Sequence, residues 1–264
     1  MFGGLTGAKK GSGTDLGERM LNAVASQSIR HLFTQSEEVE VEIRCYPSSK
    51  LLQGSIDNFK MRGRNLVIKR DFLVEEMSFE TDAVAIDPSS ILGGQIRLKQ
   101  PTQAVAQVVL TEEGINTAFG AELVQKRLVN VQMEAITNLS GGEPVSFRDV
   151  HIQLLPDNVV QISAKTDLPN CNDVPISLSA TLTVEKRRRV SFKNPRFQPD
   201  GVSESVIGLS EILSNAFAEI LDNMVDLDRF DLDGVMLRVN RLETQGKKLI
   251  FSGYAQIDHF PGTR

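Results

Sequence analysis

The chain has 264 residues, of which 41% are apolar and 24% charged, and its formal net charge at pH 7 is −5. These proportions are typical of a globular protein with a sizeable core, and the negative net charge argues against a general nucleic-acid binder. Because no run of about 18 apolar residues is present, we expect no membrane-spanning helix. Cys45 and Cys171 are far apart and lack a CxxC pattern, which predicts two core thiols in a reducing compartment.

The N-terminal residues include no apolar stretch long enough for a signal peptide, and residues 3–13 are rich in glycine and lysine. We therefore predict a flexible leader over residues 1–13, a cytoplasmic location and one elongated domain over residues 14–264. Thr14 is suited to cap a helix that extends to about Thr34, and its apolar side chains recur on one face.

Several predicted strands follow this helix. Alternating apolar residues from Val39 to Cys45 indicate a strand, and residues 54–62 and 65–69 are typical of a hairpin around Gly63. A second helix is expected to begin at Thr111, with two glutamates in its first turn. The remaining predicted elements are strands over 72–86, 96–110, 145–155, 158–168, 174–197, 234–242 and 247–258, and a third helix over 203–225.

The long strands have apolar residues of one parity only. From Val174 to Val184 every second residue is apolar, which indicates a sheet with one buried face. The order of elements shows no βαβ alternation, so we predict an α+β fold. Within it, a long, curved antiparallel sheet would wrap around the long amphipathic helix 203–225, with additional helices elsewhere.

Five segments of the sequence are characteristic of one family. They are Arg44–Gly54, Val74–Phe79, Leu139–Val145, Ile220–Phe230 and Arg241–Gly246. On these segments the chain resembles the LmeA-like phospholipid-binding family, in particular its cyanobacterial branch, over roughly residues 14–260. The resemblance implies a sheet wrapped around a long helix, similar to tubular lipid-binding folds, and affinity for phospholipid.

The apolar face of helix 203–225 is the predicted contact for lipid tails. A filled core and an acyl-chain tunnel use the same aliphatic and aromatic side chains, so both interpretations stay open from sequence. The candidate tail-binding residues are Val206, Leu209, Leu213, Phe217 and Ile220.

Four consecutive cations, Lys186, Arg187, Arg188 and Arg189, interrupt the strand 174–197. Continued alternation would turn Lys186 and Arg188 toward the buried side and the other two outward. The cluster suits a phosphate headgroup or an anionic bilayer. The alternative is a charged strand edge that prevents edge-to-edge pairing.

No catalytic or metal-binding arrangement is predicted. The three histidines share no ligand spacing, no Ser-His-Asp set can be assembled, and the acidic run from Asp222 to Asp233 fails the calcium-loop pattern. We therefore expect a soluble, non-catalytic protein without a cofactor other than a bound phospholipid.

The predicted function is to bind or carry anionic phospholipid at a membrane surface as a peripheral protein. The predicted partners are phospholipid or an anionic membrane surface, and not nucleic acid. The alternative is a structural or adaptor protein with a filled core, whose basic strand docks a protein partner.

Overall fold

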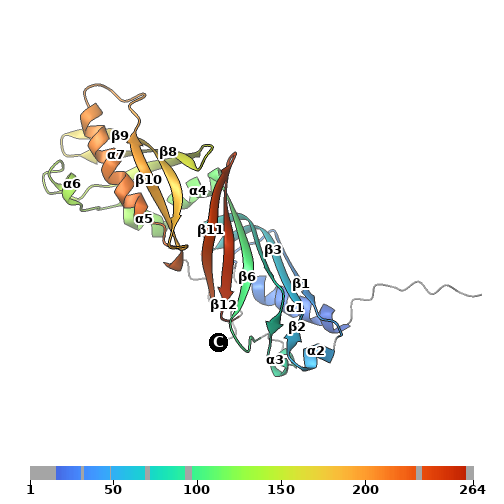
Figure 1. Ribbon diagram of the computed structural model, residues 1–264. Coiled ribbons are helices and arrows are strands. Elements are labelled where there is room, and N and C mark those ends of the chain that lie inside the picture. Colours follow the sequence, from blue (N-terminus) through green and yellow to red (C-terminus); the bar gives the residue numbers. More distant parts are fainter. Residues whose placement is uncertain are drawn as a thin grey trace, which may run out of the picture.

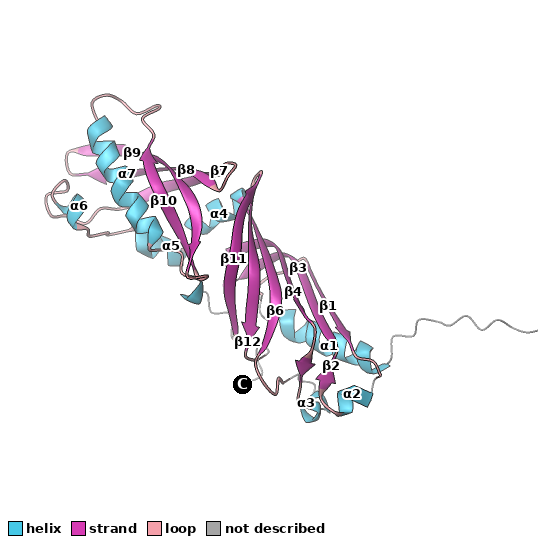
Figure 2. Cartoon of the chain, in the orientation of Figure 1, coloured by secondary structure: helices cyan, strands magenta, loops and turns pink. Residues whose placement is uncertain are grey.

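The computed structural model describes residues 16–30, 33–47, 49–68, 72–92, 97–229 and 234–259, so the predicted leader over 1–13 lies outside the described residues. The fold is α+β, as predicted, and each strand pair of the described residues is antiparallel. Figures 1 and 2 show an elongated molecule that has helices toward both ends and long strands between them.

The strands form two large sheets and a small one. The six-stranded sheet has the spatial order β1 (Glu38–Arg44), β3 (Asn58–Ile68), β4 (Phe72–Thr81), β6 (Thr102–Thr111), β12 (Lys248–Ile257) and β11 (Val235–Gln245). The four-stranded sheet has the order β10 (Arg189–Phe197), β9 (Cys171–Glu185), β8 (Val159–Leu168) and β7 (Phe147–Leu154). A two-stranded sheet joins β2 (Ser55–Ile56) and β5 (Val84–Ala85).

Helices are distributed over both ends of the molecule. They are α1 (Leu16–Arg30), α2 (Ser49–Leu52), α3 (Pro88–Leu92), α4 (Glu112–Phe119), α5 (Glu122–Leu128), α6 (Glu134–Thr137), α7 (Ile207–Asp222) and the 3-10 helix η1 (Leu227–Arg229).

The sheets differ from the single sheet predicted around helix 203–225, because the strands divide between two hydrophobic clusters. One cluster joins α1 to the six-stranded sheet, and the other joins α7 to the four-stranded sheet. Leu110 of β6 packs against both, and Leu242 and Leu249 extend β11 and β12 into the α7 cluster. The long six-stranded sheet therefore reaches the second core with one end only.

Several predicted elements have different boundaries in the structure. The predicted strand 72–86 is divided into β4 and β5, and the strand predicted over 96–110 is β6, which begins at Thr102. The predicted hairpin around Gly63 is one continuous strand, β3, in which Gly63 pairs with Val39 of β1 and Met77 of β4. The predicted strand 174–197 is two strands joined by a turn at residues 186–188. The predicted alternation in its first half is confirmed, since the apolar residues from Val174 to Leu182 are buried.

The helix predicted at Thr111 is confirmed as α4, and it protects the edge of β7. The Thr111 hydroxyl accepts a hydrogen bond from the Gly114 amide at 2.9 Å, which caps the helix. Asn116 accepts from the Ile152 amide at 2.7 Å and donates to the Ile152 carbonyl at 2.9 Å, as a neighbouring strand would. Glu112 accepts from the Leu154 amide at 2.8 Å, and this bond lowers the pKa of the Glu112 carboxyl.

Polar contacts join the two large sheets. The Asn158 side chain, in the β7–β8 turn, donates to the Leu242 carbonyl at 3.1 Å and accepts from the Thr244 amide at 2.8 Å. A bulge in β11 between Val239 and Arg241 accompanies a bond from the Val239 amide to the Arg187 carbonyl, at 2.7 Å. The four-stranded sheet thus contacts β11 through two of its three hairpin turns, β7–β8 and β9–β10.

Candidate functional site

The central turns of α7 are enclosed against the four-stranded sheet. Leu213 and Phe217 are 0% exposed, and the Phe217 ring lies 4.7 Å from the Phe147 ring, centroid to centroid. The buried hydroxyl of Ser210 donates to the Pro175 carbonyl, and that of Ser214 accepts from the Ser177 amide. These two serines lie one helical turn apart. They supply hydrogen-bond partners for β9 backbone groups at residues that precede Leu178, where the pairing of β9 with β10 ends.

The structure brings four of the five predicted tail-binding residues into one hydrophobic cluster. Leu213 and Phe217 lie at its centre, while Leu209 and Ile220 are half-buried and pack against its margin. Val206 is the N-cap residue of α7, so the helix begins later than the predicted residue 203, and its side chain is half-buried.

The basic cluster is a hairpin turn and not a continued strand, so the predicted orientation of Lys186 and Arg188 is wrong. Residues Lys186–Arg188 form the turn between β9 and β10, and their side chains are exposed. Lys186 and Arg187 have positive φ angles of 48° and 60°, which reverse the chain and end the alternation. Neither glycine nor asparagine marks this turn in the sequence.

Two of the four cations are held by carboxylates. Arg188 pairs with Asp228 at 2.7 Å, and Arg238 of β11 pairs with the other oxygen of the same carboxylate at 2.6 Å. The hydrogen bond from Arg238, followed by that from Arg188, lowers the pKa of Asp228. Arg189 pairs with Asp222, at the end of α7, at 2.8 Å.

The other two cations are directed to solvent. Within the part of the chain that the structure describes, the side chains of Lys186 and Arg187 form no ion pair. Their backbone is nevertheless fixed, because the carbonyl of Arg187 accepts from Val239 and that of Arg188 accepts from Leu227, each at 2.7 Å. The turn therefore presents two cations from a fixed loop.

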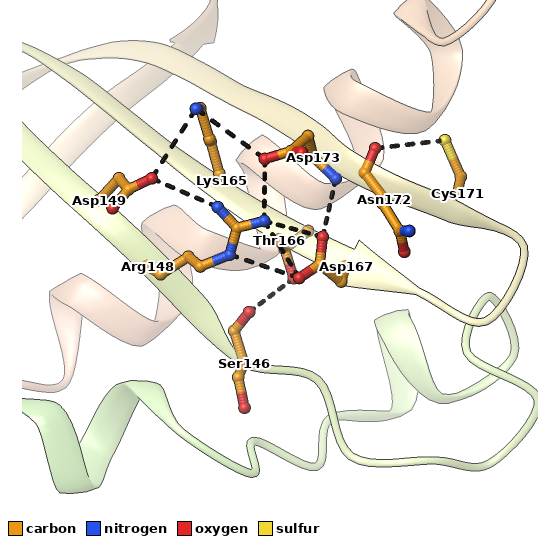
Figure 3. Close-up of polar contacts among 9 residues, drawn as sticks. All are labelled: Ser146, Arg148, Asp149, Lys165, Thr166, Asp167, Cys171, Asn172 and Asp173. Atoms are coloured by element: carbon orange, nitrogen blue, oxygen red, sulfur yellow. Dashed lines mark hydrogen bonds and ion pairs between the residues drawn. The ribbon is translucent and has the colours of Figure 1, made fainter.

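A second charged cluster, on β7, β8 and β9, consists of paired groups. Arg148 contacts Asp167 and Asp173 at 2.9 Å each and Asp149 at 3.3 Å, and Lys165 lies between Asp149 and Asp173 (Figure 3). The Asp173 amide, followed by Arg148, lowers the pKa of Asp167, and the acids raise that of Arg148. Among the described residues no group of three His, Cys, Asp or Glu is arranged to hold a metal ion.

The structure also bears on the predicted core thiols and on the expectation about a membrane-spanning helix. The two cysteines share no disulfide; Cys45 is a buried core thiol as predicted, whereas Cys171 is only half-buried. The described helices include none with the length and apolar character needed to cross a membrane.

Sequence reasoning missed one surface feature, the loop that contains α2. Tyr46 is 84% exposed and Leu52 is 83% exposed, the two highest values among the large apolar side chains that the structure describes. A signal was present, because Tyr46-Pro47 precedes a short serine-containing turn and then Leu51-Leu52.

Comparison with known proteins identifies the family. No curated protein and no solved structure gives a significant match to the chain. The model of the LmeA-like phospholipid-binding family matches residues 13–253, which include α7, the four-stranded sheet and all of the six-stranded sheet except the end of β12. The resemblance noted in the sequence is confirmed: the chain belongs to the LmeA-like phospholipid-binding family.

Proposed function

We propose that the protein binds phospholipid and carries or holds it at a membrane surface without altering it chemically. The observation that carries this proposal is the family match, which extends over nearly the whole chain. The charged clusters described above support a non-catalytic role, because their acids are paired with arginine or lysine.

The acyl chain is proposed to lie along α7. Leu209, Ile220 and Val206 are half-buried, so a chain can reach them from the margin of the hydrophobic cluster. Leu213 and Phe217 are enclosed by protein, so contact with them requires α7 to separate from β9. The family relationship also supports a tubular arrangement, in which curved sheets and this helix surround the lipid tails.

The phosphate headgroup is proposed to bind at the basic turn. Lys186 and Arg187 supply the positive charge, whereas Arg188 and Arg189 hold the turn to Asp228 and Asp222. Each cation near an anionic surface contributes about 1 kcal/mol, so the protein should prefer anionic lipid. Because the two side chains are exposed, this preference should weaken as salt concentration rises.

The experiment is lipid analysis of the purified protein. After gentle purification, native mass spectrometry should detect a phospholipid adduct, and the lipid-free protein should extract a labelled phospholipid from vesicles. A protein that carries no lipid and extracts none contradicts the proposal. A protein that releases fatty acid or a free headgroup contradicts the non-catalytic part.

A further inference from the structure

The loop from Tyr46 to Gln53 presents two large apolar side chains at one end of the molecule. Tyr46 and Leu52 are each more than 80% exposed. Figure 1 places α2, which ends at Leu52, at the end of the six-stranded sheet remote from the four-stranded sheet. Single exposed apolar residues are ordinary on a protein surface, but two that are more than 80% exposed in one short loop, at an extreme of the molecule, make that end a candidate contact surface.

Hydrogen bonds hold Tyr46 and the residues Ser49–Gly54 to the rest of the fold. The Asp57 carboxylate accepts from the Tyr46 amide at 2.7 Å and from the Lys50 ammonium at 2.6 Å. At the other end, the Gln53 amide donates to the Lys50 carbonyl at 3.0 Å, and the Gly54 amide donates to the Leu51 carbonyl at 2.9 Å. The Tyr46 and Leu52 side chains therefore extend from backbone that is held by hydrogen bonds.

The loop is also anchored to the core beneath it. Leu51 packs against the α1 cluster, while its neighbour Leu52 points to solvent. Gly54 has a φ of 77°, and a Cβ atom there would lie 2.3 Å from the carbonyl oxygen of Ile86, the residue after β5, so the backbone approaches too closely for any side chain. Side chains on an anchored backbone lose little conformational entropy when they enter another phase.

The charges beside the loop suit a phospholipid surface. Two carboxylates are paired within the protein, Asp57 with Lys50 and Glu42 with Arg44. Lys99 is exposed, and its ammonium group lies 3.5 Å from the Gln53 carbonyl. A tyrosine, a leucine and a lysine together match the interfacial layer of a bilayer, where aromatic rings lie at headgroup level and ammonium groups meet phosphate.

We propose that Tyr46 and Leu52 form the bilayer-docking tip of the protein, inserted at the interface, with Lys99 at headgroup level. This inference rests on the proposed lipid-binding function. It assigns contact with the bilayer to one end of the molecule and contact with a bound lipid to α7 and the basic turn.

The test measures vesicle binding by the full chain, with a matched control. Tyr46→Ser combined with Leu52→Ser should weaken binding to phosphatidylcholine–phosphatidylglycerol vesicles by about tenfold or more in a sedimentation assay. Val105→Ser is the control. Val105 is 71% exposed on β6, so this variant should bind the vesicles as the wild type does. Both proteins should melt as the wild type does, since exposed side chains are replaced.

A second variant tests the charge. Lys99→Ala should weaken binding to the mixed vesicles by about fivefold and leave binding to pure phosphatidylcholine vesicles unchanged. Equal loss on both vesicle types would contradict the headgroup contact.

Uptake of a monomeric short-chain fluorescent phospholipid separates this inference from the proposed function. The double variant should take up the monomer as the wild type does, although it docks poorly. A wild-type protein that takes up no monomer contradicts the proposed function. The docking tip is overturned if the double variant binds vesicles normally, if the wild type binds none, or if the substitutions alter only self-association in analytical ultracentrifugation.

Discussion

Arg189 and Asp222 tie the start of β10 to the end of α7. The Arg189 guanidinium donates to the Asp222 main-chain carbonyl from Nε at 2.9 Å and from Nη2 at 2.6 Å, and to its carboxylate at 2.8 Å. The other carboxylate oxygen accepts from the Phe192 amide at 2.8 Å. A single ion pair thus caps the helix and closes one edge of the sheet.

Arg189→Gln should lower the free energy of unfolding by about 1–2 kcal/mol, because the last carbonyl of α7 loses a charged donor. Urea unfolding followed by circular dichroism provides the measurement. Arg187→Gln is the control and should unfold as the wild type does, since the Arg187 side chain is exposed. Equal stability of the two variants would show that the Arg189 contacts contribute nothing.

Lys186→Glu combined with Arg187→Glu should weaken uptake of anionic phospholipid by about tenfold or more, because two attractive charges become repulsive. The effect should diminish as salt concentration rises. Lys126→Glu with Arg127→Glu makes the same change in net charge on the exposed surface of α5 and should leave uptake intact. Similar losses in both double variants would mean that net charge, and not the basic turn, governs binding.

Leu213→Ala and Phe217→Ala should each destabilise the protein by about 2–5 kcal/mol, because both side chains are fully enclosed. Leu209→Ala should cost less, since Leu209 is half-buried, yet it should reduce the amount of lipid bound per folded molecule. Thermal melts alongside lipid analysis separate the two effects. If the Leu213 and Phe217 variants keep their stability and lose lipid instead, those residues line a tunnel and not a filled core.

Asp228 should make stability depend on pH in the acid range. Its pKa in the folded protein lies below the ordinary value of 3.8, because Arg238 and Arg188 stabilise the carboxylate. The stabilisation is therefore complete above the ordinary pKa and is lost as the pH falls through the folded value. Asp228→Asn should be less stable than the wild type near neutral pH, with the difference shrinking below about pH 4. A constant difference across the titration would exclude this carboxylate as the cause.

Local patterns predicted the features that depend on local sequence. The alternation of β9 is correct because its buried face follows directly from a period of two, and Thr111 marks the start of α4 through its own side chain. The hairpin predicted around Gly63 is wrong because pairing with β1 and β4, on both sides of β3, keeps that glycine within a strand. Such partners are distant in sequence and leave no local signal.

The candidate site was predictable only in part. The α7 stripe could be recognised from helical spacing, and four of its five predicted residues share one cluster. The partners of the basic turn could not, since Asp222 and Asp228 are 33 and 40 residues from the arginines that they bind. Nothing in the sequence distinguishes the four adjacent cations from one another. In the structure, two of them, Arg188 and Arg189, pair with Asp228 and Asp222.

The side-chain bonds along β7 and β10 have a consequence for behaviour at high concentration. Asn116 and Glu112 already occupy the Ile152 and Leu154 amides, and Asp222 occupies that of Phe192. At these positions a strand from a second molecule finds no donor to pair with. These bonds therefore disfavour the addition of a strand from a second molecule at these positions of the four-stranded sheet.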